Sequence, residues 1–280
     1  METPQEAFAG LPIEKVAAYW NARPCNIRHS TREVGARDYF DEVEARKYFV
    51  EPHIPGFADF ERWRGKKVLE IGCGLGTDAI NFARAGAKVT AVDLSEESLA
   101  LARKRAAVFG LDIAFYQANA EELDRVVPVE TYDLVYSFGV IHHTPHPELA
   151  VERLKKYLGP NSTLKIMVYH LHSWKVFWIL LKYGQGRFWR LPELVARHSE
   201  AQTGCPVTYA YTARTARDLL RGFKVEEIRV EHIFPYSIPE YKRHEYKKVW
   251  YFRWMPDKWF RALEQRLGWH LLATARPDWF

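Results

Sequence analysis

Residues 67–77 read Lys67-Val-Leu-Glu-Ile-Gly-Cys-Gly-Leu-Gly-Thr77, an apolar run that ends abruptly in three glycines. An apolar run bounded in this way predicts a buried parallel strand followed by a sharp turn. Because glycine has no Cβ, the backbone of that turn can approach a ligand closely. A helical pattern begins at Thr77, and the N–H groups of its first turn would point at the same place. We therefore predict a ligand-binding turn; the alternative is a glycine-rich turn that binds nothing.

The spacing of the glycines separates two classes of nucleotide site. Dinucleotide-binding turns carry G-x-G-x-x-G, whereas Gly72, Gly74 and Gly76 follow G-x-G-x-G. With Glu70 before them, they resemble motif I of the class I S-adenosylmethionine (SAM)-dependent methyltransferases, E/D-x-G-x-G-x-G. A second apolar run ends at Asp93, about 20 residues further on. A carboxylate at that position can accept hydrogen bonds from both hydroxyls of an adenosine ribose.

The resemblance implies that the cofactor is SAM, with S-adenosylhomocysteine as its product. In similar enzymes the adenine lies after the third strand, where the usual acceptor is Asp. This chain has Asn119 there, whose carbonyl oxygen can accept the same bond. The implied cofactor-binding residues are Glu70, Gly72, Cys73, Gly74, Gly76, Thr77, Asp93, Leu94, Ser98, Asn119, Ala120, Glu121 and Phe138.

Strand patterns alternate with helix patterns over the next 100 residues, which predicts an α/β fold with a doubly wound, Rossmann-like parallel sheet. Ligands of such sheets bind at the carboxyl ends of the strands. The resemblance implies seven strands, the last one antiparallel. The predicted strands are residues 67–71, 89–93, 113–119, 132–138, 163–170, 224–234 and 269–276, and the predicted helices are residues 77–85, 96–109, 148–158, 174–182 and 212–220.

Residues 1–64 are predicted to form an N-terminal helical lid, because large apolar groups recur there at helical spacing. In similar enzymes this segment covers the cofactor cleft, which makes Tyr39 and Tyr48 candidates for the pocket wall. The alternative is that these side chains only fasten the segment to the domain. Residues 65–280 are the predicted methyltransferase domain, with helical cap insertions at residues 171–211 and 235–268.

The composition argues against a secreted or membrane-spanning protein. Three cysteines among 280 residues are scattered and odd in number, so neither a disulfide framework nor a cysteine zinc site is indicated. The N-terminus has no basic region followed by an apolar core. The longest strongly apolar run, residues 176–181, is too short to cross a bilayer. We therefore expect a cytoplasmic location.

The charge of the chain is unevenly placed. Residues 171–280 contain 19 Lys and Arg against 11 Asp and Glu, a net charge of +8, and eight of the ten tryptophans. Such a region could bind nucleic acid, an anionic membrane surface or an acidic substrate. The alternative is a solvated surface over an aromatic core. The fourth strand ends in Ser137-Phe-Gly-Val, without the paired prolines of amino-group methylases, which argues against nucleic acid.

His142 and His143 follow the fourth strand directly, where the loop borders the transferred methyl group in similar enzymes. Histidine has a pKa suited to a general base, so both are candidate catalytic residues; the alternative is that they face solvent or cap a helix. His170, at the end of the fifth strand, could also reach the acceptor. Some quinone-methylating relatives carry E-x-x-E-H at this loop. Here both carboxylates are missing, so no metal site is expected.

Transfer of a methyl group from a sulfonium is an in-line displacement that depends mainly on orientation. Our leading hypothesis is transfer to an oxygen or nitrogen of a small, aromatic or amphiphilic metabolite. One alternative is a nucleic-acid or protein methyltransferase that uses the basic region. Others are a non-catalytic SAM-binding protein and an enzyme in peripheral contact with a membrane. The sequence leaves the oligomeric state open.

Overall fold

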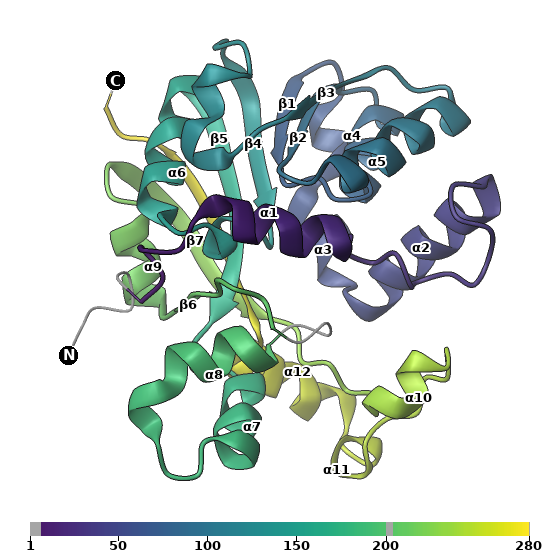
Figure 1. The fold of residues 1–280 in the computed structure, drawn as a ribbon, viewed down its shortest axis with the longest axis vertical. Helices are drawn as coiled ribbons and strands as arrows, with labels where there is room; N and C mark the ends of the chain where they lie inside the picture. Colours follow the sequence, from purple (N-terminus) through teal and green to yellow (C-terminus); the bar gives the residue numbers. More distant parts are fainter. Residues whose placement is uncertain (1–6, 200–203, 280) are drawn as a thin grey trace.

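The computed structural model describes residues 7–199 and 204–279, which are built around an eight-stranded sheet (Figure 1). Residues 1–6 of the predicted lid and residues 200–203 of the first predicted cap lie outside the described residues. The strands are β1 Lys67–Ile71, β2 Lys88–Asp93, β3 Ile113–Gln117, β4 Tyr132–Phe138, β5 Leu158–His170, β6 Ala210–Tyr211, β7 Phe223–Glu231 and β8 His270–Pro277.

The strands lie in the order β3-β2-β1-β4-β5-β8-β7, and the short β6 pairs with the end of β5. Strands β1 to β5 are parallel, whereas β8 runs antiparallel to both β5 and β7. Successive side chains of a strand point to opposite faces, and Val68 and Leu69 of β1 belong to two different apolar clusters. The predicted doubly wound sheet with an antiparallel last strand is confirmed. Strand β6 was not predicted.

Local sequence signals set the ends of several helices. Ser95 caps α5 by accepting the Ser98 N–H at 3.1 Å, and Gly110 ends that helix in the left-handed region with φ 65°. The helices are α1 Ile13–Ala22, α2 Arg37–Val50, α3 His53–Ala58, α4 Thr77–Arg84, α5 Glu96–Phe109, α6 Pro147–Leu154, α7 Trp174–Tyr183, α8 Leu191–His198, α9 Ala213–Leu219, α10 Ile238–Lys242, α11 Trp250–Arg253 and α12 Asp257–Leu267.

Two strands end earlier than predicted, each for a local reason. Strand β3 ends at Gln117 because Asn119 caps the short helix η3 (Ala120–Arg125), its Oδ1 accepting a backbone N–H at 3.1 Å. Strand β7 ends at Glu231 because the next residue, His232, has a left-handed backbone with φ 72°. An extended strand cannot continue through that conformation.

Helices α1, α2 and α3 precede β1. In Figure 1, α1 crosses in front of the sheet. Its Val16 belongs to the apolar cluster that contains Val92 of β2 and Ile141 after β4, and Trp20 packs against the same cluster. Helix α2 packs on α5, where the buried Arg105 guanidinium donates to Glu44 Oε2 at 2.7 Å. The N-terminal segment is thus packed on the domain along most of its described length.

Two groups of helices lie beyond the carboxyl end of β5, in the lower half of Figure 1. Helices α7 and α8 are inserted between β5 and β6, and α10, α11 and α12 between β7 and β8. Their surfaces carry large aromatic side chains, with Trp250 and Trp254 being 81% and 83% exposed. Within residues 7–199 and 204–279, none of the helices combines the length and apolar character needed to cross a membrane.

Candidate functional site

The glycine turn is tied to the end of the neighbouring strand β2. The N–H groups of Gly72 and Cys73 both donate to the Val92 carbonyl, at 2.7 and 2.9 Å. The next glycine of the motif, Gly74, donates its N–H to Asp93 Oδ2 at 2.7 Å. Burial raises the pKa of Asp93, and backbone N–H bonds oppose the rise. The two sequence features that indicated a nucleoside site therefore meet in one place.

Glycine is required at the first position of the turn. The φ angle of Gly72 is 78°, and a Cβ at this residue would lie 2.1 Å from Val140 Cγ2. The loop after β4 is therefore pressed against the glycine turn. At Gly76, with φ 73°, a Cβ would lie 3.1 Å from Ala102 Cβ of α5. Close approach of backbone to neighbouring side chains explains both glycines.

Glu70, one residue before the end of β1, carries a carboxylate close to the glycine turn. It is buried, and burial together with the nearby Asp78 raises its pKa well above the usual range. Its Oε2 has no hydrogen-bond partner among the described residues. A buried acceptor of this kind is costly unless a donor satisfies it. An ammonium group of a ligand would supply such a donor, so the residues fit an amino-acid-bearing nucleoside such as SAM.

Other predicted cofactor residues are engaged by the protein itself. Asn119 Oδ1 accepts the Glu121 N–H at 3.1 Å, and Glu121 Oε1 in turn accepts the His146 N–H at 2.8 Å, at the start of α6. The Thr77 hydroxyl accepts a bond from Arg105 at 2.7 Å and so faces α5. These side chains are thus engaged in bonds that connect neighbouring segments of the protein.

The remaining predicted cofactor residues differ in their surroundings. Ala120 lies in the apolar cluster that contains Val16 of α1, and Leu94 packs against that cluster. Ser98 is buried in the first turn of α5. Phe138, at the carboxyl end of β4, is half-buried among aromatic rings, including Tyr136.

The two adjacent histidines after β4 have different environments. His142 is completely buried, and neither of its ring nitrogens has a hydrogen-bond partner among the described residues. Burial therefore lowers its pKa well below the usual value. His143 Nδ1 lies 2.8 Å from the Val207 carbonyl. Because a carbonyl only accepts, Nδ1 carries the proton and Nε2 is the acceptor nitrogen. The Trp20 ring of α1 lies 5.3 Å from the His143 ring.

His170 lies at the end of β5, on the side of the second cap. Its Nδ1 is 3.1 Å from the Gly268 carbonyl, and burial lowers its pKa. Of the predicted lid residues, Tyr39 is completely buried against the cluster that contains Leu75 of the glycine turn. Its hydroxyl donates to the Ile27 carbonyl at 2.9 Å.

Tyr48 belongs to a buried polar network centred on Asp78, a residue that the sequence did not single out. Asp78 is 1% exposed. Its carboxylate accepts bonds from Lys47 Nζ at 2.8 Å, the Tyr48 hydroxyl at 2.9 Å and the Tyr136 hydroxyl at 3.1 Å. The network joins α2 to the first turn of α4 and to β4. An acidic residue just after the glycine turn was the only sequence signal for it.

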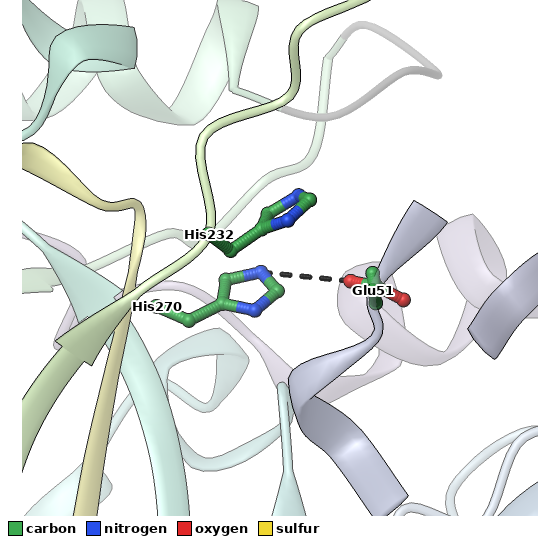
Figure 2. A group of neighbouring side chains, drawn as sticks. All are labelled: Glu51, His232 and His270. Carbon is green, nitrogen blue, oxygen red and sulfur yellow. Dashed lines mark ion pairs between the residues drawn. The ribbon is translucent and has the colours of Figure 1, made fainter. Parts of the chain in front are cut away.

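A second group that the sequence did not predict contains one carboxylate and three histidines. Figure 2 shows Glu51 facing the rings of His232 and His270. The fourth member, His53, has its Nε2 2.9 Å from His270 Nδ1. Burial lowers the pKa of His53 to about 3 and those of His232 and His270 well below the usual value. The centroids of the His53 and His270 rings lie 6.0 and 5.5 Å from that of the Phe138 ring, so the group lies beside the carboxyl end of β4.

Residues 68–161 match a family model described as a methyltransferase domain. The match begins at β1 and ends in β5, and it contains the glycine turn, Asp93 and both histidines after β4. Residues 68–161 are thus similar to methyltransferase domains. The helices before and after this segment lie outside the match.

The chain is also similar to curated relatives over part of its length. It is 36% identical over 103 residues to a ubiquinone biosynthesis O-methyltransferase of Actinobacillus pleuropneumoniae, covering 36% of this chain and 44% of that protein. It is 37% identical over 98 residues to the same enzyme of Photobacterium profundum, covering 35% and 41%. The matched segment thus spans less than half the length of these relatives.

Solved structures share the fold over nearly the whole chain. Magnesium protoporphyrin IX methyltransferase from Synechocystis, solved with bound SAH, has a TM-score of 0.58 and 17% identity, covering 94% of this chain and 99% of its own. A [4+2]-cyclase covers 98% and 96%, with a TM-score of 0.55 and 17% identity. One fold therefore carries different named activities, and the site residues must identify the reaction.

Proposed function

We propose that this protein is a SAM-dependent methyltransferase that methylates an oxygen or nitrogen of a small molecule. The contact between Asp93 and the Gly74 N–H carries the proposal, because it brings a ribose-binding carboxylate against a turn that a nucleoside can approach. The kinship with ubiquinone O-methyltransferases supports a small-molecule acceptor. The exposed aromatic side chains of the caps support an aromatic or amphiphilic one.

Within this proposal, each group of residues has a separate task. The glycine turn, Asp93 and Glu70 would hold the cofactor, which supplies an electrophilic methyl group on a positively charged sulfur. Fixing the acceptor in line with that group contributes on the order of 7–11 kcal/mol through orientation. His143 would accept the proton of a hydroxyl acceptor at Nε2, since its Nδ1 is held by the Val207 carbonyl.

The proposal is tested with methyl-labelled SAM added to a cell extract that contains the purified protein. The products are separated into protein, nucleic acid, lipid and small organic molecules. We expect label among the small molecules or lipids, and none with the Asp93→Ala variant. The matched control, Asp112→Ala, removes an exposed carboxylate just before β3 and should transfer label normally.

Label in protein or nucleic acid would instead support the alternative that uses the basic C-terminal region. SAM binding without any transfer would support the non-catalytic alternative. Vesicle flotation at low and high salt tests peripheral membrane contact, since electrostatic attachment to anionic lipid weakens with salt.

A further inference from the structure

Three connections that are far apart in the sequence bring one carboxylate and three imidazoles together. Glu51 ends α2 and His53 begins α3, His232 follows β7, and His270 is the first residue of β8. The side chains of Glu51, His232 and His270 face one another (Figure 2). One donor atom each from Glu51, His232 and His270 lie within 4.8 Å of one another. Imidazole and carboxylate are the usual ligands of divalent transition metals.

The distance between Glu51 and His270 fits a shared ion better than a direct bond. His270 Nε2 lies 3.6 Å from Glu51 Oε1, which is too long for a hydrogen bond. Two ligand atoms on one tetrahedral zinc ion, each about 2.0–2.2 Å from it, lie roughly 3.3–3.5 Å apart. Glu51 Oε1 and His270 Nε2 would therefore need to approach each other by only a few tenths of an ångström to bind the same ion.

His53 lies where a supporting residue of a metal site is found. Ligating histidines usually donate their second ring N–H to a neighbouring acceptor. The 2.9 Å contact between His270 Nδ1 and His53 Nε2 allows that arrangement. With the proton on His270 Nδ1, the lone pair of Nε2 points toward Glu51. The contact thus orients the nitrogen that an ion would need.

The backbone holds His232 in an unusual conformation. Its φ of 72° is uncommon for a residue other than glycine. Its carbonyl accepts the Trp269 N–H at 2.7 Å, which fixes it beside the start of β8. Residues kept in the left-handed region often belong to functional sites. Here the conformation ends β7 and turns the imidazole toward His270, 4.6 Å away between ring centroids.

We propose that Glu51, His232 and His270 bind one divalent transition-metal ion, with zinc the best fit, and that His53 positions His270. Three protein ligands leave a fourth position of a tetrahedral ion open, the arrangement of catalytic rather than structural zinc sites. Because the group borders Phe138 at the end of β4, an oxygen of the acceptor would take that position. This last part rests on the proposed methyltransferase function. A bound ion lowers the pKa of a coordinated hydroxyl and so makes its deprotonation easier.

The test uses the whole chain, stripped with a chelator and then titrated with Zn²⁺ by calorimetry and with Co²⁺ by visible absorption. We expect one ion per chain and a tetrahedral Co²⁺ spectrum. Glu51→Gln and His232→Ala should each weaken binding roughly 100-fold or more, and His53→Ala about 10- to 100-fold. The controls Glu97→Gln and His172→Ala alter exposed side chains and should bind as the unchanged protein does. Circular dichroism checks that every variant is folded.

Equal affinity in the ligand variants and the controls would overturn the ion site. SAM binding is measured separately on the stripped protein, so that failure of the ion site can be distinguished from failure of the proposed function. If the ion binds but labelled methyl transfer fails, the ion site stands and the methyltransferase proposal falls. If stripped and zinc-loaded protein transfer methyl groups equally well, the role of the ion toward the acceptor is refuted.

Discussion

In the proposed function His143 acts as the base, because the Val207 carbonyl leaves its Nε2 as the acceptor nitrogen. We expect His143→Ala to lower kcat for a hydroxyl acceptor by about 100- to 10,000-fold, the usual contribution of a general base. The affinity for SAM should stay unchanged, since this histidine does not hold the cofactor. His172→Ala, which alters an exposed histidine, is the matched control. A loss of SAM affinity equal to the loss of kcat would point to a structural role.

His142 should make the stability of the fold depend on pH. Burial lowers its pKa well below that of the unfolded chain, about 6.5, so the unfolded state binds more protons between these two values. Its contribution is present in full above pH 6.5 and is lost as the pH falls below it. In His142→Leu the slope of unfolding free energy against pH should be shallower, by at most about 1.4 kcal/mol per pH unit.

The measurement for His142 is urea unfolding between pH 7.5 and pH 5.0 in the presence of a chelator. Near pH 7.5 the variant should be no less stable than the unchanged protein, because it removes two buried nitrogens that have no partner within residues 7–199 and 204–279. His172→Leu should keep the original slope. An unchanged slope in His142→Leu would mean that this histidine is protonated or solvated in the folded protein.

At the scale of elements, the Asp78 network joins α2 to α4 and β4. Asp78→Asn should lower the free energy of unfolding by about 3 kcal/mol, because it leaves Lys47 buried without its counter-charge. Glu42→Gln makes the same chemical change on α2, in a pair with Arg32 that is 2.8 Å long but exposed. It should cost less than about 1 kcal/mol. Chemical denaturation of both variants gives the comparison, and equal losses would contradict this account of the network.

Elements with local signals were predictable from the sequence, and contacts between distant segments were not. The apolar run before Gly72 and the cap at Ser95 each act within a few residues, so β1 and α5 have the predicted positions. By contrast, β7 ended early at His232, where no glycine signalled a left-handed turn. Glu51, after α2, and His270, at the start of β8, lie 3.6 Å apart although 218 residues separate them in the sequence. The spacing of residues along the sequence does not indicate that these two side chains are close in the fold.

For the whole molecule, the position of α1 ties the N-terminal segment to the carboxyl ends of β2 and β4. Its Val16 lies in the cluster that includes Val92 and Ile141, at the carboxyl ends of β2 and β4. A ligand that stabilises these ends should therefore also stabilise α1. We expect slower deuterium uptake in residues 13–22 when SAM is added, and no change in α12, measured by hydrogen exchange with mass spectrometry. Unchanged or faster uptake in α1 would contradict the prediction that the N-terminal segment is a lid.

Because β6 pairs with β5, the segment between these two strands could be replaced, and the specificity of the protein could change with it. The chain leaves the sheet at His170 and returns at Ala210, and these two residues lie on neighbouring, hydrogen-bonded strands. Adjacent strands are about 4.8 Å apart, so the exit and the entry of the α7–α8 segment almost coincide. Because β5 and β6 are parallel, the connection must be a crossover, and a different crossover segment could join the same two points without disturbing the glycine turn. Chimaeras made at this junction would exchange the segment that carries α7 and α8 and leave the sheet and the glycine turn unchanged.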